Sequence, residues 1–370
     1  MAKLQTIKFK NFITLQRGFD LPKKDMIEGL YPVVGSTSIL GYHNQYKVNP
    51  PGVVTGRSGS LGKVQFINEK YWPHNTALWV KDFKGNYSDY VYYYLQTINL
   101  DKFNSGTGVP TLNRNDLDNL EIKVHKIVAQ KTIATVLSAY DDLIENNNRR
   151  IKILEKIAQT LYNEWFVKFR FPGHEKVKMV NSELGKIPVK WEIKNIFDIC
   201  NIRYGKTLPT TKMKKDGEYL VYGAAKVIGK YDEYNYENPM VITGCRGSVG
   251  QIKITKPKSF VTNNSFIFDI NEEQKLFLYH SLLNIGLYNY IGGTAQPQIT
   301  LEGISALKLV IPEQDLISEF NKIVVPIFKQ INLLDDKNNN LIETRDILLP
   351  KLISGKLNVS DLDIKTEDTE

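Results

Sequence analysis

Hydrophobic side chains recur at alternating intervals of four and three residues in the middle of the chain, between residues 126 and 171. This segment contains neither Gly nor Pro, so it lacks the two residues that most often interrupt a helix. A 4-3 spacing places side chains along one stripe of an α-helix and is typical of a coiled-coil seam. The positions of this stripe are Ile133, Leu137, Tyr140, Ile144, Asn147, Ile151, Leu154, Ala158 and Leu161.

A second stripe with the same spacing lies 187 residues further along the chain. Pro326 falls near its start, where a Pro either kinks a helix or delays its beginning. We expect a second long helix that packs against the first through this largely apolar stripe. Its positions are Phe320, Val324, Ile327, Ile331, Leu334, Asn338, Leu341, Arg345 and Leu348.

Each stripe contains one Asn, and this pair bears on how the helices are arranged. In an antiparallel pair with Asn147 facing Asn338, Ile151 faces Leu334 and the other partners are mostly apolar. A parallel alignment at the repeat offset places each Asn against an aliphatic side chain, which costs roughly 1–3 kcal/mol. The pattern favours an antiparallel coiled coil whose register the Asn pair fixes. The alternative is that both Asn are solvated members of polar runs.

The segments that precede the two stripes resemble each other at an offset of about 188 residues. Residues 31–62 align without a gap with residues 219–250, and residues 106–110 (G-T-G-V-P) match residues 293–297 (G-T-A-Q-P) in the same order. The matched positions include Gly35 with Gly223, Gly41 with Gly229, Pro51 with Pro239, and Thr55-Gly56 with Thr243-Gly244. A match of this length indicates a duplicated module in which each copy is a globule followed by a helix.

Each globule combines short strands with a helical stretch. Short β-type runs lie between Gly, Pro and Asn residues, and apolar stretches at 87–100 and 274–290 favour helices. The expected fold class is α+β, with two similar mixed α/β domains in tandem, joined by two long helices that form an antiparallel coiled coil. The expected boundaries are 1–125 and 173–312 for the domains, 126–172 and 313–357 for the helices, and 358–370 for an acidic, disordered tail.

The charge of the chain suits a polyanionic partner. Its 370 residues include 48 Lys and Arg against 40 Asp and Glu. The last ten residues hold five acids and one Lys, which leaves 47 basic and 35 acidic residues, a formal +12, in the rest. A basic body is compatible with nucleic-acid binding, although many basic proteins bind none.

Cysteine and histidine usage argues against a metal centre and against catalysis by this chain. Cys200 and Cys245 are the only cysteines, and neither they nor the five scattered His have metal-ligand spacing. The chain also lacks a run of about 18 apolar residues and a signal peptide. We therefore expect no catalytic residue, no metal, no membrane association and a cytoplasmic location.

Two loops in each globule carry side chains suited to reading DNA. The glycine-rich loop at 55–62 and its counterpart at 243–250 allow close backbone approach to a ligand. Arg, Asn and Gln in the loops are the residue types that hydrogen-bond guanine or adenine in the major groove, although they are also common in plain turns. The candidate contacts are Arg57, Ser58, Ser60, Thr107, Asn113 and Arg114 in the first globule, and Arg246, Ser248, Thr294, Gln296 and Gln298 in the second.

The combination of motifs resembles the specificity subunits of type I restriction-modification complexes over nearly the whole chain. The motifs are T-G-R-S-G-S-L-G and T-G-C-R-G-S-V-G in the loops, L-E-K-I-A-Q-T-L-Y-N-E-W-F at 154–166, and L-L-P-K-L-I-S-G-K-L at 348–357. The resemblance implies that the globules are target-recognition domains, the helices are spacer regions, and each domain reads one half of a split double-stranded DNA target. His125 departs from the second copy, which has Pro312, and this difference touches only a junction.

The resemblance also implies partners. It implies that the chain is noncatalytic and binds two modification (methyltransferase) subunits, and with them the restriction (motor-nuclease) subunits. S-adenosylmethionine, ATP and Mg are then expected on the partner subunits and not on this chain. Two other functions remain open from the residues: a self-contained DNA methyltransferase, whose nucleotide motif the sequence lacks, and a repeat scaffold without a nucleic-acid role.

Overall fold

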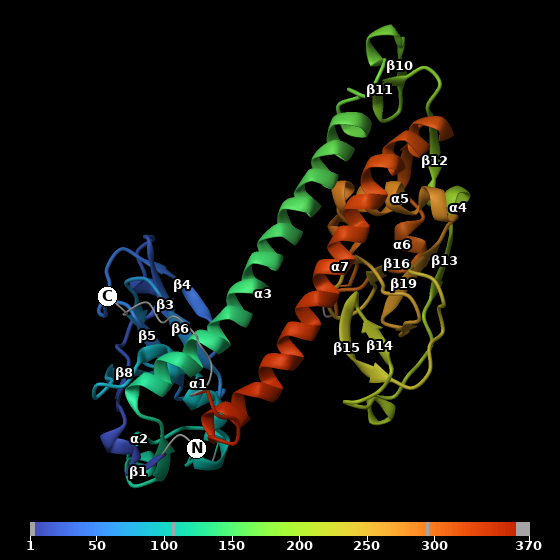
Figure 1. Cartoon of the computed structure of the whole chain (residues 1–370). Helices are drawn as coiled ribbons and strands as arrows, with labels where there is room; N and C mark the ends of the chain where they lie inside the picture. The colour runs from blue at the N-terminus through green and yellow to red at the C-terminus, as the bar shows by residue number, and fades with distance from the viewer. Residues whose placement is uncertain (1–3, 106–107, 294–295, 360–370) are drawn as a thin grey trace. The chain divides into compact units, whose positions relative to one another are not determined.

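The computed structural model describes residues 4–105, 108–293 and 296–359. The chain divides into two compact units, which are labelled by element in Figure 1. Unit 1 comprises residues 1–148 and 335–370, and unit 2 comprises residues 149–334. The division crosses both long helices, so each unit consists of one globule and a half of each helix.

The described residues of unit 1 form three small sheets. A four-stranded sheet has the order β2-β8-β5-β6, a three-stranded sheet has the order β4-β3-β7, and β1 pairs with β9. The strands are β1 (Gln5–Lys8), β2 (Thr14–Arg17), β3 (Tyr31–Val34), β4 (Ile39–His43), β5 (Gly52–Gly56), β6 (Val64–Ile67), β7 (Trp72–Pro73), β8 (Ala77–Asp82) and β9 (Glu121–Val124). Two shorter helices, α1 (Ser88–Thr97) and α2 (Arg114–Asp118), complete the globule.

Unit 2 repeats this topology strand for strand. Its sheets have the orders β13-β19-β16-β17, β15-β14-β18 and β12-β20, while the hairpin β10-β11 is an addition. The strands are β10 (Met179–Ser182), β11 (Gly185–Pro188), β12 (Glu192–Asn195), β13 (Asn201–Tyr204), β14 (Tyr219–Gly223), β15 (Lys226–Tyr231), β16 (Val241–Gly244), β17 (Ile252–Ile254), β18 (Phe260–Val261), β19 (Ser265–Asp269) and β20 (Lys308–Ile311). The helices are α4 (Ile196–Ile199), α5 (Glu272–Ile285) and α6 (Leu301–Ile304). The predicted duplication is confirmed.

The helical stretch predicted at 274–290 is partly wrong. Helix α5 begins earlier, because the side chain of Asn271 caps it by accepting a hydrogen bond from the Gln274 N–H at 2.9 Å. It ends at Ile285, because Gly286 adopts a φ of 68°, a left-handed conformation that favours glycine and stops the helix. A separate 3-10 turn, Tyr288–Tyr290, follows.

The two long helices are α3 (Ile127–Tyr162) and α7 (Gln314–Ile353), and they pack together. Helix α3 continues into a π-helical turn at Asn163–Val167. Helix α7 begins at Gln314 and runs through Pro326, so Pro326 does not delay its beginning. Every predicted stripe position is buried or half-buried, whereas most positions between them are exposed. No helix among the described residues is long and apolar enough to cross a membrane.

Each unit buries both helices in its own core. In unit 1, Ile133 and Leu137 of α3 and Leu352 of α7 join the core formed by the first globule. In unit 2, Ala158 of α3 and Phe320 of α7 join an aromatic cluster with Trp165 and neighbouring rings. The helices are therefore integral parts of both units and not free linkers.

Asn147 and Asn338 face each other within unit 1. The Asn147 side-chain amide donates to the Asn338 side-chain oxygen at 2.9 Å, and Asn338 donates in turn to Asn148 at 2.9 Å. Both Asn147 and Asn338 are buried, at 8% and 5% exposure. Since these amides satisfy each other away from water, the antiparallel arrangement needs no unpaired polar group at this layer. That the pair sets the register remains a prediction.

Replacing Asn147 alone with Leu is expected to lower the free energy of unfolding by roughly 1–3 kcal/mol, because Asn338 then loses its buried donor. The double replacement, Asn147→Leu with Asn338→Leu, should recover most of this loss. Urea unfolding of the two variants and the wild type measures both effects. The exposed neighbour Asn146, replaced with Leu, is the matched control. Equal stability of the single and double variants would contradict the expectation.

Candidate nucleic-acid interface

The glycine-rich loop of unit 1 is held by backbone hydrogen bonds on two sides. On one side, the N–H groups of Arg57 and Ser58 both donate to the Thr76 carbonyl, at 2.9 and 3.1 Å. On the other, the Gly59 N–H donates to the Pro110 carbonyl at 2.9 Å. At Gly56 a Cβ would lie 2.0 Å from the Ser60 carbonyl oxygen, so only glycine allows the loop to fold back there.

The structure brings the two predicted loops of unit 1 together. Ser58 forms a β-bridge with Thr111, and the Leu112 N–H donates to the Arg57 carbonyl at 2.8 Å. The segment after residue 107 therefore lies directly beside the glycine-rich loop. The predicted residue Thr107 itself lies outside the described residues.

Three arginines converge on one hollow at this junction. A pocket of about 400 Å³ is lined by Arg17, Arg57 and Arg114, together with Leu78, Ser105, Thr111, Leu112 and Asn113. A second hollow of about 600 Å³ adjoins it through Arg17 and Arg114 and adds Lys81. Clustered guanidinium groups in a concave surface can bind phosphates and read guanine edges.

Sequence reasoning missed Arg17. It ends strand β2 immediately before Gly18, where a Cβ would lie 2.1 Å from the His74 carbonyl oxygen. Its guanidinium pairs with Asp20 at 2.8 Å. A hydrogen bond from the Asn75 amide, and then the charge of Arg17, hold the pKa of Asp20 below its usual value. The signal available in the sequence was the repeated glycine, Gly18 and Gly205, which marks a close approach in both units.

The predicted side chains of unit 1 differ in how free they are. Asn113 caps helix α2 by accepting from the Asn115 N–H at 3.1 Å, so its oxygen already has a structural use. Arg114 donates to the Leu15 carbonyl at 3.3 Å and Arg57 donates to the Asn75 carbonyl at 3.2 Å, each through one nitrogen only. A guanidinium has five N–H donors, so both arginines retain donors for a ligand. Ser60 is exposed and Ser58 is half-buried.

Unit 2 holds its glycine-rich loop in the same way. The N–H groups of Cys245 and Arg246 both donate to the Asn264 carbonyl, at 3.0 and 3.4 Å, and Arg246 forms a β-bridge with Gln298. At Gly244 a Cβ would lie 2.2 Å from the Ser248 carbonyl oxygen. Ser248 is half-buried and Arg246 is exposed. The two loops thus share a backbone.

The loop arginines, however, occupy different positions of that backbone. The equivalent of Arg57 is Cys245, because the Arg57 N–H donates to the Thr76 carbonyl as the Cys245 N–H donates to the Asn264 carbonyl. Arg246 is instead the equivalent of Ser58, since each forms the β-bridge to the second loop of its unit. Cys245 is fully buried, so the equivalent of Arg57 in unit 2 presents no donor to a ligand. The same scaffold therefore presents an arginine at two different places.

The second loop of unit 2 carries Gln296 and Gln298. Gln296 is exposed, and its side chain has no hydrogen-bond partner within residues 4–105, 108–293 and 296–359. Gln298 is half-buried and exchanges two backbone hydrogen bonds with Gly292, at 2.8 and 2.9 Å. Thr294 lies outside the described residues.

Sequence reasoning also missed two exposed apolar pairs beside these loops. Ile39 and Leu40 begin strand β4 next to Ser36, whose hydroxyl donates to the Ser58 carbonyl at 2.7 Å. Their repeat equivalents, Val227 and Ile228, are exposed in unit 2 as well. The signal was the apolar pair before Gly41 and Gly229 in both copies.

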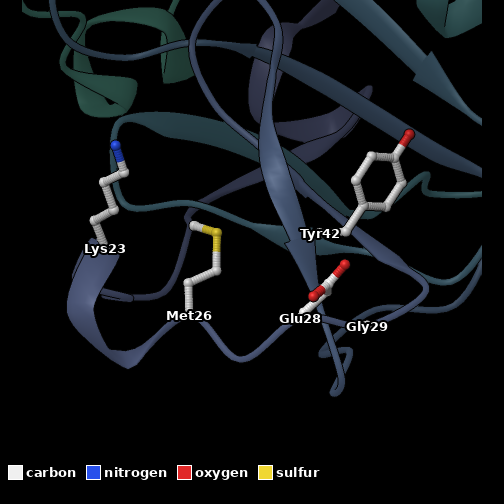
Figure 2. A pocket seen from close by; sticks show the side chains of 5 residues that line it. All are labelled: Lys23, Met26, Glu28, Gly29 and Tyr42. Atoms are coloured by element: carbon white, nitrogen blue, oxygen red, sulfur yellow. The ribbon is translucent and has the colours of Figure 1, made fainter.

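Other hollows and titratable groups fit a nucleic-acid interface less well. Figure 2 shows a pocket of about 400 Å³ formed by Lys23, Met26, Glu28, Gly29 and Tyr42, in which the two charges are of opposite sign. Burial raises the pKa of the Cys200 thiol to about 12, so this cysteine stays protonated and unreactive. Among the described residues there is no group of three or more His, Cys, Asp or Glu side chains placed to hold a metal ion.

Comparison with known families gives a match over most of the chain. The model of the type I restriction modification DNA specificity domain matches residues 1–156 and 188–344. The two matches cover both globules, and each extends into the long helix that follows its globule.

Individual relatives agree with this family. The chain is 29% identical to the type I restriction enzyme MjaIX specificity subunit of Methanocaldococcus jannaschii over 75% of this chain and 71% of that protein. It is 24% identical to the HindI specificity subunit of Haemophilus influenzae over 68% and 72% of the two chains. The crystal structure of a type I S subunit from M. genitalium has the same fold, with a TM-score of 0.63 at 21% identity over 95% of this chain and 96% of that one.

Proposed function

The chain belongs to the family of type I restriction-modification specificity subunits, and from this premise we propose how its two units divide the recognition of DNA. Each unit reads one half of an asymmetric, bipartite target. In unit 1 the hollow lined by Arg17, Arg57 and Arg114 contacts bases and binds phosphates, and Arg57 is the main side chain that recognises a base. In unit 2 the reading side chains are Arg246 and Gln296.

One observation carries this proposal: the two units share a loop backbone but present different polar side chains from it. Backbone and phosphate contacts fix how a protein lies on DNA, while side chains at base edges select the sequence. A shared backbone therefore supports a shared way of docking, and different side chains support different half-sites. The clearest difference is the place of the loop arginine, because Arg246 in unit 2 lies one backbone position after the equivalent of Arg57.

The partners and cofactors of the complex complete the proposal. Two modification subunits bind this chain and methylate adenine at the target, and restriction subunits join them for cleavage. The chain itself contributes recognition and no catalysis. S-adenosylmethionine, ATP and Mg bind to the partner subunits, and the complex acts on DNA in the cytoplasm.

The experiment that tests the proposal is methylome sequencing of cells that carry the modification genes, with and without this chain. We expect a bipartite methyladenine motif that disappears completely when the chain is deleted and returns when it is supplied from a plasmid. The complementing plasmid must encode the full chain and not unit 1 alone, because each unit uses part of both long helices in its core. A methylome that is unchanged by the deletion would contradict the proposal.

A further inference from the structure

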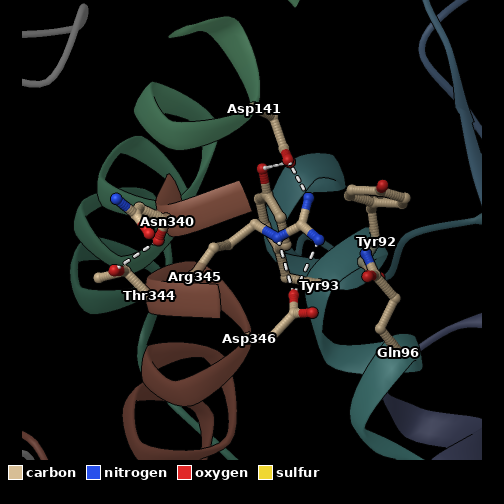
Figure 3. Close-up of polar contacts among 8 residues, drawn as sticks. All are labelled: Tyr92, Tyr93, Gln96, Asp141, Asn340, Thr344, Arg345 and Asp346. Carbon is tan, nitrogen blue, oxygen red and sulfur yellow. Dashed lines mark hydrogen bonds and ion pairs between the residues drawn. The ribbon is translucent and has the colours of Figure 1, made fainter. Parts of the chain in front are cut away.

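A polar cluster fills the space between helices α1, α3 and α7 in unit 1, as Figure 3 shows. The Tyr93 hydroxyl donates to Asp141 at 2.6 Å, and Asp141 forms an ion pair with Arg345. The same guanidinium also contacts Asp346 at 2.8 Å. This cluster explains why an arginine stands in a largely apolar stripe, since its charge is paired on both sides.

The repeat replaces every member of this cluster in unit 2. At the offset of 187 residues, His280 stands for Tyr93 and Phe328 stands for Asp141. At the same offset, Ala158 stands for Arg345. Ala158 is fully buried in the core of unit 2, and its methyl group carries no charge that could reach Phe328, as Arg345 reaches Asp141 in unit 1.

Two of these equivalents, His280 and Phe328, line a pocket of unit 2. Its volume is about 630 Å³, and it is lined by Lys152, Glu155, Lys156, Gln159, Tyr279, His280, Leu283, Asn284, Phe328 and Ile331. The base is aromatic, with the ring centroid of Phe328 at 5.6 Å from Tyr279 and 5.7 Å from His280. Gln159 fixes the imidazole, whose Nδ1 lies 2.9 Å from the Gln159 side-chain oxygen. Aromatic and aliphatic walls of this kind accept an apolar side chain.

The rim of the pocket is basic, whereas the equivalent face of unit 1 is acidic. Lys152 and Lys156 are exposed on α3, with Glu155 between them. Their equivalents on α7 are Asn339, Glu343 and the apolar Ile342, and Asp346 follows. An acidic partner segment is therefore attracted to the rim in unit 2 and repelled from the corresponding face in unit 1.

We propose that the pocket of unit 2 anchors an aromatic or leucine side chain from an acidic segment of the modification subunit, and that unit 1 offers no such anchor because Tyr93 and Asp141, the equivalents of His280 and Phe328, are bound to each other and to Arg345. The inference rests on the proposed function, which supplies two copies of one partner. Identical copies then bind unequally, and the copy that contacts unit 2 is held more tightly.

A protein side chain fits this site better than a free small molecule. The pocket opens onto exposed faces of α3 and α5, where Leu283 is 40% exposed beside the two rim lysines. An isolated small molecule would leave this apolar rim in water, whereas a partner surface covers it and surrounds the anchor with contacts that exclude water.

The test measures how the full chain binds purified modification subunit, by native mass spectrometry and by titration without DNA. Wild type should bind two copies with affinities that differ at least tenfold. The variant Lys152→Glu with Lys156→Glu should weaken the tighter binding at least tenfold and leave the weaker one unchanged. Ala158→Arg, which copies unit 1, should do the same. Lys178→Glu with Lys186→Glu, two exposed lysines of unit 2 outside the pocket, is the matched control.

The outcomes separate the two levels of the proposal. If the wild-type chain binds no modification subunit, the proposed function itself is wrong. If it binds two copies with equal affinity, or if the rim variant behaves like its control, only the pocket assignment is overturned. A small molecule that copurifies with the chain and is lost in Ala158→Arg, with partner binding unchanged, also overturns it. Because Lys152 and Lys156 are exposed, the rim variant remains informative if Ala158→Arg fails to fold.

Discussion

Replacing Arg57 with Ala is expected to reduce discrimination at one half of the target by roughly 10- to 100-fold, while the other half is read as before. A bidentate contact between an arginine and guanine contributes about 1–3 kcal/mol of discrimination. Arg57 lines the hollow of unit 1 and commits only one of its nitrogens to the Asn75 carbonyl. Competition binding of the assembled complex to DNA substituted at each position of the target measures the effect.

The reciprocal variant, Arg246→Ala, is the matched control, because it removes the loop arginine of unit 2. It should relax the other half of the target and leave intact the half that Arg57 reads. A loss of affinity that is uniform across all sequences, with a salt slope reduced by about one, would mean that Arg57 contacts phosphate. That result would refute its assignment as the reading side chain.

The second large effect concerns acid stability, and it depends on His280. Burial lowers the pKa of this imidazole to about 4 in the folded chain, against roughly 6.5 when unfolded. At a pH between these two pKa values, His280 is protonated in the unfolded chain and neutral in the folded chain. The contribution of His280 is therefore fully present above about pH 6.5 and is lost as the pH falls towards 4, by roughly 3 kcal/mol in all.

Urea unfolding of the full chain at intervals from pH 4 to pH 7 measures this loss. His280→Gln removes the titrating group, so the difference between wild type and variant should change with pH over that window. His74 and His125 also have pKa values lowered by burial, but they are present in both proteins and cancel in the difference. A difference that does not depend on pH would show that His280 titrates normally in the folded chain.

Patterns that depend on spacing predicted the architecture well. The 4-3 stripes identified both long helices, and the matched glycines identified the duplicated globule, because a heptad and a close backbone approach each restrict which residues can occupy a position. Gly56 and Gly244 illustrate this, because a Cβ added at either would lie 2.0 or 2.2 Å from a carbonyl oxygen, far closer than van der Waals contact allows. The end of α5 was harder, because Gly286 falls inside an otherwise apolar run.

The candidate interface was less predictable, because it depends on which distant segments meet. Arg17 lies about 40 residues before Arg57 in the chain, and only the β2-β8-β5 order brings them to one hollow. The repeated glycine that follows Arg17, Gly18, marks a close backbone approach but does not show which hollow the Arg17 side chain lines. The alignment already pairs Arg57 with Cys245, and the backbone hydrogen bonds confirm that Arg57 and Arg246 occupy different positions of the loop.

The way the glycine-rich loops are held has a consequence for how this chain can change. Main-chain hydrogen bonds and glycines hold most of each loop, with the Ser36 hydroxyl on the Ser58 carbonyl in unit 1, so the side chains at positions 58 and 246 contribute little to folding. Evolution can therefore vary these positions almost independently of stability and acquire a new target in few steps. For the same reason, a randomised library confined to the exposed loop positions of one unit is a practical route to recoding that half of the target while the other half stays fixed.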